Sequence, residues 1–435
     1  MGSSATLQKR IAGGGACVCV VGQGYVGLSV AAGAALAGMI VNGFDTDVGR
    51  VEALSQGRSV VPGVAESSFR DAMATGRLGF GTDPRVIARA DVVLICVPTP
   101  LIDHRPDLSA VESAGRLVGE HLSSSTLVVL ESTTYPGTTE EVLRPLLERS
   151  DRRAGREFWL AYSPERIDPG NERFGLSEVP RVVGGIDPAS TELARAFYAP
   201  LVPSVHTVSN CRAAELAKLL ENTFRMVNIA LVNELAQLCA DQGIDTWEVI
   251  AAAATKPFGF MAFYPGPGVG GHCIPLDPAY LTWQSRRDTG RPFRLVEMAK
   301  DINDQMPTYV ARRIIDALNE RGQAVKGARL LALGVTYKPD VGDVRESAAL
   351  QVLAHLARRG ARLSFHDPFV PRIDELGLRL RRSRLTDAAV AGADAVLLLT
   401  PHASYDLDAL AGRARLLFDA RNATGRRDLP NVVTL

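Results

Sequence analysis

A single cysteine lies in a segment rich in glycine and proline, between Phe263 and Pro278. Cys273 is preceded by His272 and followed four residues later by Asp277. A thiol reacts as the thiolate, so a reactive cysteine needs a partly open, polar pocket that favours this form. Glycine lets the backbone approach a ligand closely, and proline stiffens the loop. Two interpretations remain open for this segment alone, a nucleophile in a binding loop or an incidental buried thiol, because free cysteine is usually a small core residue.

Near the N-terminus, the sequence contains a glycine pattern that is typical of dinucleotide binding. Gly22, Gly24 and Gly27 follow a short apolar run that predicts a strand, and an alanine-rich run that predicts a helix comes next. The next predicted strand, 40–44, ends at Asp45, about 20 residues after the first glycine. Such glycines let backbone N–H groups approach a pyrophosphate at the helix N-terminus. The acid would bind a ribose hydroxyl and repel a 2′-phosphate, which favours NAD over NADP.

Uniformly apolar runs alternate with helical patterns through the first half of the chain. The runs 91–97 and 126–131 predict buried strands, and they lead into Thr99 and Thr133. This alternation predicts a doubly wound parallel sheet, in which ligands bind beyond the carboxyl ends of the strands. Both threonines therefore fall where a ligand would bind, although a role in a turn or a cap is the common alternative.

The pattern changes from about residue 210, where 212–241 predicts one long helix with apolar residues around much of its circumference. Lys218 and Asn222 lie one turn apart on that helix, either on a solvated face or directed into a site. After residue 327 the alternating strand and helix pattern resumes, and Lys338 and Arg421 each follow a predicted strand. These two cations suit a phosphorylated or nucleotide-linked substrate, or they are surface charges.

These patterns predict an α/β protein with two Rossmann-like doubly wound parallel-sheet domains joined by a long central helix. We expect a disordered leader over 1–14 and an NAD-binding domain over 15–208. A central helical domain with the cysteine loop is expected over 209–320, and a second Rossmann-like domain over 321–435. The length of 435 residues is consistent with two or three domains.

Composition narrows the functional classes. Lys and Arg together number 48, as do Asp and Glu, so charge gives no reason to expect nucleic acid or an anionic membrane as partner. The six cysteines have irregular spacings that match neither a disulfide framework nor a zinc site. The apolar run 16–44 is interrupted by glycines, unlike a signal peptide or a membrane span. We therefore expect a cytoplasmic protein with reduced thiols and no metal.

A dinucleotide domain and a nucleophilic cysteine together indicate a reaction class. The dinucleotide supplies a hydride acceptor. A cysteine captures an aldehyde as a thiohemiacetal, which can lose a second hydride and leave a thioester for water to hydrolyse. This combination suggests oxidation of a primary alcohol through the aldehyde to the acid, or of an aldehyde to the acid.

Over nearly its full length, the chain resembles the UDP-glucose/GDP-mannose dehydrogenase family, the four-electron NAD-dependent nucleotide-sugar 6-dehydrogenases. The resemblance is carried by Gly22-Gln-Gly-Tyr-Val-Gly27, Cys96-Val-Pro-Thr-Pro100, Glu131-Ser-Thr-Thr-Tyr-Pro-Gly-Thr-Thr139, Ser163-Pro-Glu-Arg166, Glu215-Leu-Ala-Lys218 with Asn222, Gly270-Gly-His-Cys273 with Asp277, Lys338-Pro-Asp340, Asp343-Val-Arg-Glu-Ser347 and Phe418-Asp-Ala-Arg421. It implies an NAD-binding domain, a central helical domain and a UDP-binding domain, a UDP-sugar substrate, and a homodimer formed through the long helix.

The resemblance also implies roles for individual residues. Cys273 is the nucleophile, and Asp277 and Thr133 hold the catalytic water. Lys218 and Asn222 stabilise negative charge on the 6-oxygen, and Glu165 assists hydrolysis. The implied cofactor contacts are Gly22, Gly24, Tyr25, Val26, Gly27, Asp45, Arg50, Pro98, Thr99, Thr133 and Arg345. The implied substrate contacts are Glu165, Arg166, Lys218, Asn222, Tyr264, Gly268, Gly270, Lys338 and Arg421.

The cysteine segment is similar to the branch of the family that oxidises UDP-N-acetylhexosamines. UDP-glucose and GDP-mannose members usually carry serine before the cysteine and lysine before the aspartate, where this chain has His272 and Leu276. The expected substrate is UDP-N-acetylglucosamine, followed by its galacto and manno epimers, with UDP-glucose as the alternative. Ser29 and Ala279 depart from that branch, which usually has proline and an aromatic residue there.

Two other functional classes compete with this expectation. One is a nucleotide-sugar binding protein with a degenerate site, which the retention of Cys273, Lys218, Asn222 and Asp277 disfavours. The other is a two-electron 3-hydroxyacid dehydrogenase, which has related architecture and no need of the thiol.

Overall fold

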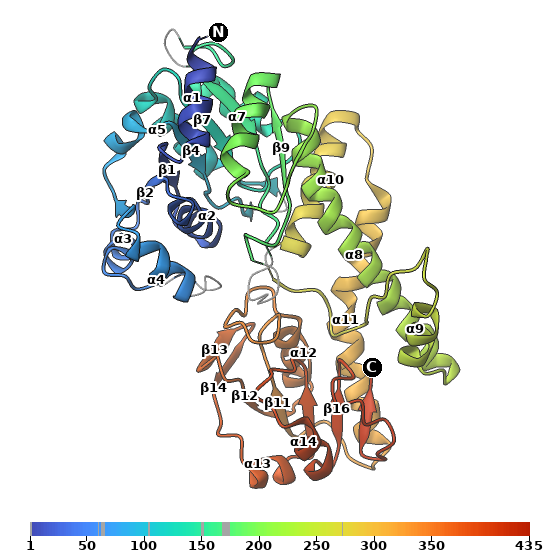
Figure 1. Cartoon of the computed structure of the whole chain (residues 1–435). Helices are drawn as coiled ribbons and strands as arrows, with labels where there is room; N and C mark the ends of the chain where they lie inside the picture. Colours follow the sequence, from blue (N-terminus) through green and yellow to red (C-terminus); the bar gives the residue numbers. More distant parts are fainter. Residues whose placement is uncertain are drawn as a thin grey trace. The chain divides into compact units, whose positions relative to one another are not determined.

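The computed structural model describes residues 2–59, 61, 66–102, 105–148, 152–167, 175–271 and 273–435, and only the backbone of Gly2, Ser3 and Cys273. The chain forms two compact units (Figure 1). The first contains residues 1–221 and 279–288, and the second contains residues 222–278 and 289–435. Two helices, α8 (Cys211–Gln242) and α10 (Cys273–Thr289), contribute residues to both units.

The described part of the first unit is built on an eight-stranded sheet in the order β10-β9-β8-β7-β4-β1-β2-β3. All neighbours pair in parallel except β8 and β9, which are antiparallel. The strands are β1 (Cys17–Val21), β2 (Ile40–Phe44), β3 (Leu78–Gly81), β4 (Val92–Ile95), β7 (Leu127–Leu130), β8 (Trp159–Tyr162), β9 (Arg181–Gly185) and β10 (Val205–Thr207). The predicted parallel sheet is confirmed, with one antiparallel pair that the sequence did not reveal.

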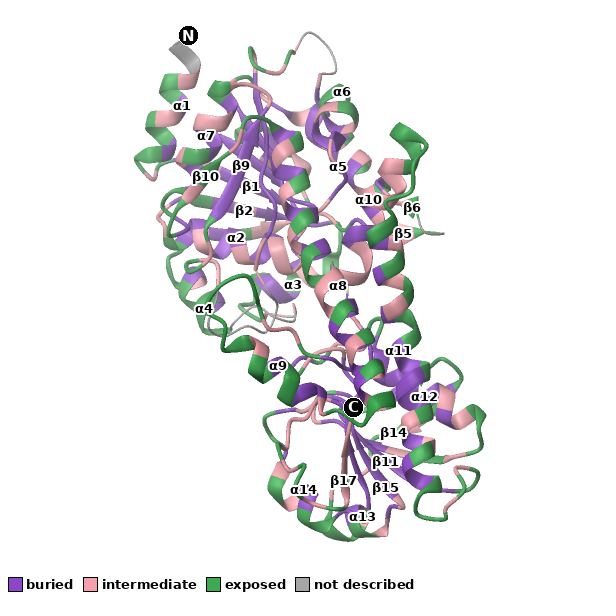
Figure 2. Ribbon diagram, turned by 90° about the vertical axis from the view of Figure 1, so that its right-hand side faces the viewer, coloured by how far each residue is buried: buried purple, intermediate pink, exposed green. Residues whose placement is uncertain are grey.

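Helices cover both faces of this sheet, whose central strands β1, β4, β7 and β8 are largely buried (Figure 2). Because side chains alternate along a strand, Val18 and Val20 join one apolar cluster while Cys19 and Val21 join another. The remaining elements are α1 (Gly2–Ala12), α2 (Tyr25–Leu36), α3 (Val48–Ser55), α4 (Glu66–Ala74), the 3₁₀ helix η1 (Pro84–Arg89), the short strands β5 (Leu101–Ile102) and β6 (Arg105–Pro106), α5 (Ser109–His121), the π-helical turn η2 (Thr139–Leu143), α6 (Arg144–Leu147) and α7 (Pro188–Tyr198).

The predicted disordered leader is corrected by α1. Leu7 and Ile11 lie one helical turn apart, and each is only 1% exposed in a cluster that includes Phe197 of α7. Gln8 also donates a hydrogen bond to Glu192 across 3.0 Å. The sequence of this segment offers only two apolar residues that could pack, so it resembles a disordered leader. The helix that it packs against, α7, lies far along the chain and could not be identified from the local sequence.

The described part of the second unit contains a five-stranded parallel sheet in the order β12-β11-β15-β16-β17. This confirms the second predicted Rossmann-like sheet. The strands are β11 (Arg329–Leu333), β12 (Arg362–His366), β15 (Ala395–Leu398), β16 (Leu417–Asp419) and β17 (Val432–Thr434), and β13 (Arg372–Glu375) pairs with β14 (Leu378–Arg381) as a hairpin. The helices are α9 (Thr246–Ala254), α11 (Arg294–Asn319), α12 (Ala348–Arg358), α13 (Asp387–Gly392) and α14 (Leu407–Arg413).

The long helix predicted over 212–241 is α8, which has 32 residues. The cysteine segment differs from the expected loop, because α10 begins at Cys273 itself. Pro275 falls in the first turn of α10, where backbone N–H groups have no intrahelical partner and proline is tolerated. None of the helices in the described ranges has the length and apolar character needed to cross a lipid bilayer.

Candidate functional site

In the first unit, the turn between β1 and α2 has the geometry of a phosphate cradle. Gly22 has φ +92°, and a Cβ at Gly27 would lie 1.9 Å from the Gly22 carbonyl oxygen, so both positions require glycine. A Cβ at Gly24 would meet nothing within 4 Å, which leaves open space beside the backbone. Since α2 begins at Tyr25, the N-terminal end of this helix adjoins the open space. The turn therefore fits the pyrophosphate of a dinucleotide.

Asp45 follows β2 and is only 7% exposed. Its carboxylate accepts hydrogen bonds from the backbone N–H of Gln23 at 2.7 Å and of Asp47 at 2.9 Å. It also forms an ion pair with Arg50 at 2.8 Å. These contacts fix the carboxylate beside the glycine turn. The Arg50 guanidinium is engaged by this carboxylate, which suits a ribose hydroxyl better than a 2′-phosphate.

The ends of β4 and β7 are tied to each other. The Thr99 hydroxyl donates a hydrogen bond to the Thr133 carbonyl oxygen at 2.7 Å, and the Tyr280 hydroxyl donates one to the Thr99 carbonyl oxygen. Thr99 is 7% exposed, Thr133 is half-buried, and Pro98 is exposed. The two threonines thus lie together at the carboxyl edge of the sheet, where ligands of such folds bind.

Glu165, beyond the end of β8, is held by a buried ion network that the sequence did not reveal. Its carboxylate accepts from the backbone N–H groups of Arg166 and Ile167, both at 2.7 Å, and from the Arg181 guanidinium at 2.7 Å. Arg181 also pairs with Glu131, which in turn accepts from the Tyr198 hydroxyl. Burial raises the pKa of Glu131, and the charge of Arg181 opposes that rise. An arginine at the start of an otherwise apolar strand, 181–185, was the available sign of this network.

Within the second unit, Asn222 and Asp277 contact each other, since the Asn222 amide donates a hydrogen bond to the Asp277 carboxylate. Their exposed fractions are 5% and 4%. Cys273 begins α10, and Asp277 follows one turn later on the same helix. Lys218, which is 9% exposed, lies one turn before Asn222 on α8. His272 lies outside the described residues.

The loop before Cys273 packs closely against the segment that follows β11 in the second unit. Gly271 has φ +87°, its N–H donates to the Arg345 carbonyl oxygen at 3.2 Å, and a Cβ there would lie 2.7 Å from the Tyr337 ring. A Cβ at Gly270 would lie 2.6 Å from the Glu346 carbonyl oxygen. The glycines at these positions therefore permit backbone-to-backbone contact that a side chain would prevent.

Earlier in the same loop, Gly268 has φ +136° and is buried, whereas Tyr264 is 56% exposed and stacks on Trp247 with ring centroids 5.8 Å apart. A Cβ at Gly266 would lie 2.6 Å from a terminal nitrogen of Arg421.

Arg421 is half-buried and follows β16. Burial lowers the pKa of its guanidinium, and none of the described carboxylates forms an ion pair with it. A buried cation without an anionic partner is stabilised by binding an anion. Lys338 is half-buried in the loop after β11, and its carbonyl oxygen accepts from Thr336 at 2.9 Å. Arg345 is exposed and pairs with Asp343 at 2.6 Å.

The predicted residues thus fall into one group in each unit. The first unit contains Gly22, Gly24, Tyr25, Val26, Gly27, Asp45, Arg50, Pro98, Thr99, Thr133, Glu165, Arg166 and Lys218. The second contains Asn222, Tyr264, Gly268, Gly270, Cys273, Asp277, Lys338, Arg345 and Arg421. The first group, apart from Lys218, gathers at the carboxyl edge of the larger sheet, and the second combines the cysteine segment with the cationic loops of the smaller sheet.

Three family models match successive parts of the chain. The NAD binding domain of the UDP-glucose/GDP-mannose dehydrogenase family matches residues 16–202, its central domain matches residues 212–305, and its UDP binding domain matches residues 331–426. The matched order agrees with the cradle in the first unit and the cationic loops in the second.

Individual relatives extend the match along most of the chain. A UDP-N-acetyl-D-glucosamine 6-dehydrogenase from Pseudomonas aeruginosa is 37% identical, with 82% of this chain and 84% of the relative covered. The structure of a UDP-D-ManNAc dehydrogenase from Pyrococcus horikoshii has a TM-score of 0.86 at 31% identity, covering 96% of this chain and 98% of that one. A UDP-glucose dehydrogenase from Pyrobaculum islandicum has a TM-score of 0.84 at 29% identity, covering 96% and 97%. The chain therefore belongs to the UDP-glucose/GDP-mannose dehydrogenase family, and it is an NAD-dependent nucleotide-sugar oxidoreductase.

Proposed function

We propose that this protein oxidises the 6-hydroxyl of a UDP-N-acetylhexosamine to the carboxylate, with UDP-N-acetylglucosamine as the preferred substrate. Support for the N-acetylated sugars comes from relatives that are named as dehydrogenases of UDP-N-acetyl-D-glucosamine and UDP-N-acetyl-D-mannosamine, at 37% and 35% identity. UDP-glucose is the second candidate, because a UDP-glucose dehydrogenase shares the fold with a TM-score of 0.84.

The proposed reaction uses Cys273 as a covalent nucleophile. Loss of a hydride from C6 and of the hydroxyl proton gives an aldehyde, which the thiolate attacks to form a thiohemiacetal. Loss of a second hydride gives a thioester, and water then releases the carboxylate and returns the thiol. Bound NAD⁺ supplies the hydride acceptor for each of the two oxidations. The balance is one water consumed and two hydrides transferred for each sugar.

The observation that carries the proposal is the placement of Cys273, Asp277 and Asn222. Cys273 is the first residue of α10, and helix N-termini favour the thiolate form of cysteine. Asp277 lies one turn further along α10 and accepts a hydrogen bond from Asn222. In the proposed reaction Asp277 orients the hydrolytic water together with Thr133, and Asn222 and Lys218 stabilise charge on the 6-oxygen. Glu165 assists the hydrolytic step.

Arg421 and Lys338 are the proposed anchors of the UDP diphosphate, with the segment 264–270 against the sugar nucleotide. Support comes from the half-buried guanidinium of Arg421, which none of the described carboxylates neutralises. Arg166 and Arg345 remain proposed contacts, of the substrate and of the cofactor respectively.

The experiment that tests the substrate measures product identity and NADH yield with UDP-GlcNAc, UDP-GalNAc, UDP-ManNAc and UDP-glucose. We expect two NADH for each UDP-N-acetylhexosamine consumed and a uronic acid product. Turnover of UDP-glucose alone would overturn the preferred substrate, and one NADH for each sugar would overturn the four-electron chemistry.

The change Cys273→Ser tests the nucleophile. We expect stalling after the first oxidation or at an ester, because a serine hydroxyl is a weaker nucleophile than a thiolate. A two-electron dehydrogenase would lose almost no activity. A nucleotide-sugar binding protein would bind NAD without turning over any UDP-sugar, in both the native chain and the variant.

We further propose that two copies associate along α8. Leu216, Leu220, Phe224, Leu231 and Leu238 are all between 47% and 62% exposed, and helical spacing places them on one stripe of α8. A second copy would cover this apolar stripe.

The proposed domain boundaries are 15–208, 209–320 and 321–435. The proposed location of the protein is the cytoplasm, where thiols such as the free Cys19 and Cys96 stay reduced.

A further inference from the structure

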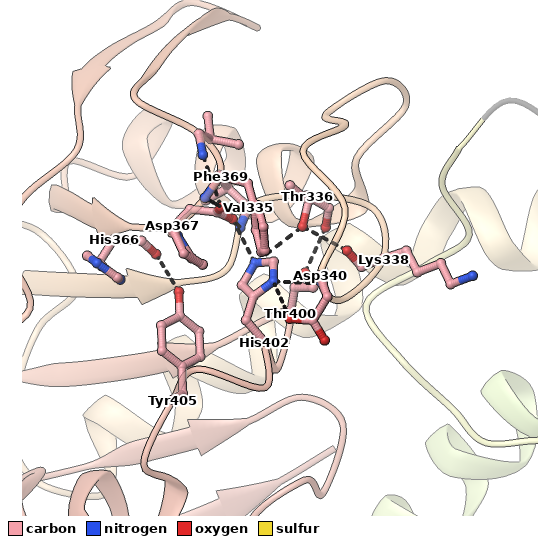
Figure 3. A network of polar contacts seen from close by, with 12 residues as sticks. Val335, Thr336, Lys338, Asp340, His366, Asp367, Phe369, Thr400, His402 and Tyr405 are labelled. Carbon is pink, nitrogen blue, oxygen red and sulfur yellow. Dashed lines mark hydrogen bonds and ion pairs between the residues drawn. The ribbon is translucent and has the colours of Figure 1, made fainter. Parts of the chain in front are cut away.

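We propose that His402 is a positioning residue for the loop that carries Lys338, and so for the binding of the UDP moiety. The inference rests on the proposed function, in which Lys338 contacts the UDP diphosphate. His402 follows β15 in the second unit, and its side chain is 0% exposed. The imidazole therefore acts through the groups it contacts inside the domain, which come from three separate loops (Figure 3).

The contacts of His402 define its protonation. Its Nδ1 lies 2.9 Å from the backbone nitrogen of Asp340. Because a backbone N–H can only donate, Nδ1 must be the acceptor and carries no proton. The proton is then on Nε2, which lies 2.9 Å from Asp367 and donates to that carboxylate. The same carboxylate accepts the backbone N–H of Val335 at 2.8 Å. The neutral imidazole thus connects the end of β12 to the loop after β11.

The loop after β11 is held on both sides of Lys338. On one side, the Thr336 carbonyl oxygen accepts from the Thr400 hydroxyl at 2.7 Å, and the Thr336 hydroxyl donates to the Lys338 carbonyl oxygen at 2.9 Å. On the other side, Asp340 receives the His402 contact, and its carboxylate accepts from the backbone N–H of Ala403 at 3.0 Å. The side chain of Lys338 extends away from the imidazole (Figure 3).

The backbone conformation of Asp340 explains why the hydrogen bond to His402 matters for this loop. Its φ is +60°, a left-handed conformation that is strained for a residue with a side chain. The conformation persists only where surrounding contacts stabilise it. His402 provides the acceptor for the N–H of this residue, so loss of the acceptor would release the loop two residues after Lys338. The inference is therefore that His402 sets the position of the lysine and never touches the ligand.

Two matched substitutions separate the contacts of the imidazole. In His402→Asn, the amide oxygen can take the place of Nδ1 and still accept from Asp340, whereas in His402→Gln the longer side chain places its amide toward Asp367. We expect H402N to bind UDP almost as the native chain does. H402Q should bind UDP about tenfold more weakly, which corresponds to the loss of one hydrogen bond. Calorimetry with the full chain and UDP measures both, and NAD affinity is the internal control that should stay unchanged.

A double-mutant cycle with Lys338→Met shows whether His402 acts through the lysine. K338M alone should weaken UDP binding, and adding H402Q to it should cause no further loss. If H402Q weakens binding equally with and without Lys338, or if H402N is as weak as H402Q, the inference is wrong. If K338M leaves UDP affinity intact, the proposed diphosphate contact is wrong instead.

Thr336→Val provides a second route should the His402 variants fail to fold. This nearly isosteric change removes the hydroxyl that donates to the Lys338 carbonyl oxygen. We expect the same selective loss of UDP affinity, again absent in the K338M background. A Thr336→Val chain with native UDP affinity would overturn the inference.

Discussion

Glu165 and Glu215 are both buried carboxylates of the first unit, but different groups stabilise their charge. Glu165 faces the guanidinium of Arg181, whereas Glu215 is held by the N–H groups of Gly137 and Thr139 and by the Thr139 hydroxyl. A carboxylate without a cation suffers the full penalty of burial, and burial raises the pKa of Glu215 to about 7. The two residues should therefore respond differently to substitution of the groups that hold them.

Protonation of Glu215 should make stability depend on pH. Its pKa is about 7 in the folded chain, against 4.5 for a solvent-exposed glutamate, so between these values the folded chain binds more protons than the unfolded chain. The Glu215 contribution to the free energy of unfolding should therefore fall as pH rises from 4.5 to 7, by about 3 kcal/mol in total. Urea unfolding of the native chain and of Glu215→Gln on both sides of this window measures the difference. A difference between the two that does not change with pH would contradict this prediction.

Arg181 should be essential for the placement of Glu165. Arg181→Met leaves two carboxylates buried without a cation, which should lower the free energy of unfolding by about 3–5 kcal/mol. Arg181→Lys keeps the charge but loses the planar fork that contacts Glu131 and Glu165 together. We expect the lysine variant to be folded, with reduced kcat and nearly native KM for NAD. Chemical denaturation and steady-state kinetics check both, and full kcat in Arg181→Lys would exclude a positioning role.

At the scale of the elements, the glycine turn, Asp45 and the two threonines could be placed from the sequence, because parallel strands carry the residues that follow them to one edge of the sheet. The network of Glu131, Arg181 and Tyr198 could not be placed, because it closes only when β9 pairs antiparallel with β8 and α7 packs behind them. The start of α10 at Cys273 was hidden by prolines that usually end a helix.

Helix α1 provides a test of the corrected leader. Leu7→Ala should lower the free energy of unfolding by about 2–5 kcal/mol, because Leu7 is 1% exposed against α7. Lys9→Ala, at an exposed position of the same helix, is the matched control and should change it by less than about 0.5 kcal/mol. Equal stability of the two variants in urea unfolding would mean that α1 does not pack as described.

At the scale of the whole molecule, the apolar stripe on α8 is exposed to water in a single chain, and this exposure is energetically unfavourable. Leu220 and Leu231 are both 62% exposed, and the proposed association of two copies would remove them from water.

If a second copy covers this stripe, the double change Leu220→Glu and Leu231→Glu should convert a dimer into a monomer, because each glutamate would be buried without a partner. Arg225→Glu, on the opposite side of α8, is the control and should leave the assembly intact. Light scattering coupled to size-exclusion chromatography measures the mass of each. A dimer that survives the double change would place the interface elsewhere.

The guanidinium of Arg421 is half-buried beside Gly266, and none of the described carboxylates balances its charge. Its occupancy should therefore depend on the anions in the buffer. If Arg421 binds the UDP diphosphate as proposed, small oxyanions should compete for its guanidinium, and UDP affinities measured in phosphate or sulfate buffer should be weaker than those measured in chloride. In a cell, a higher orthophosphate concentration would then raise the nucleotide-sugar concentration that the enzyme needs to reach half of its maximal rate.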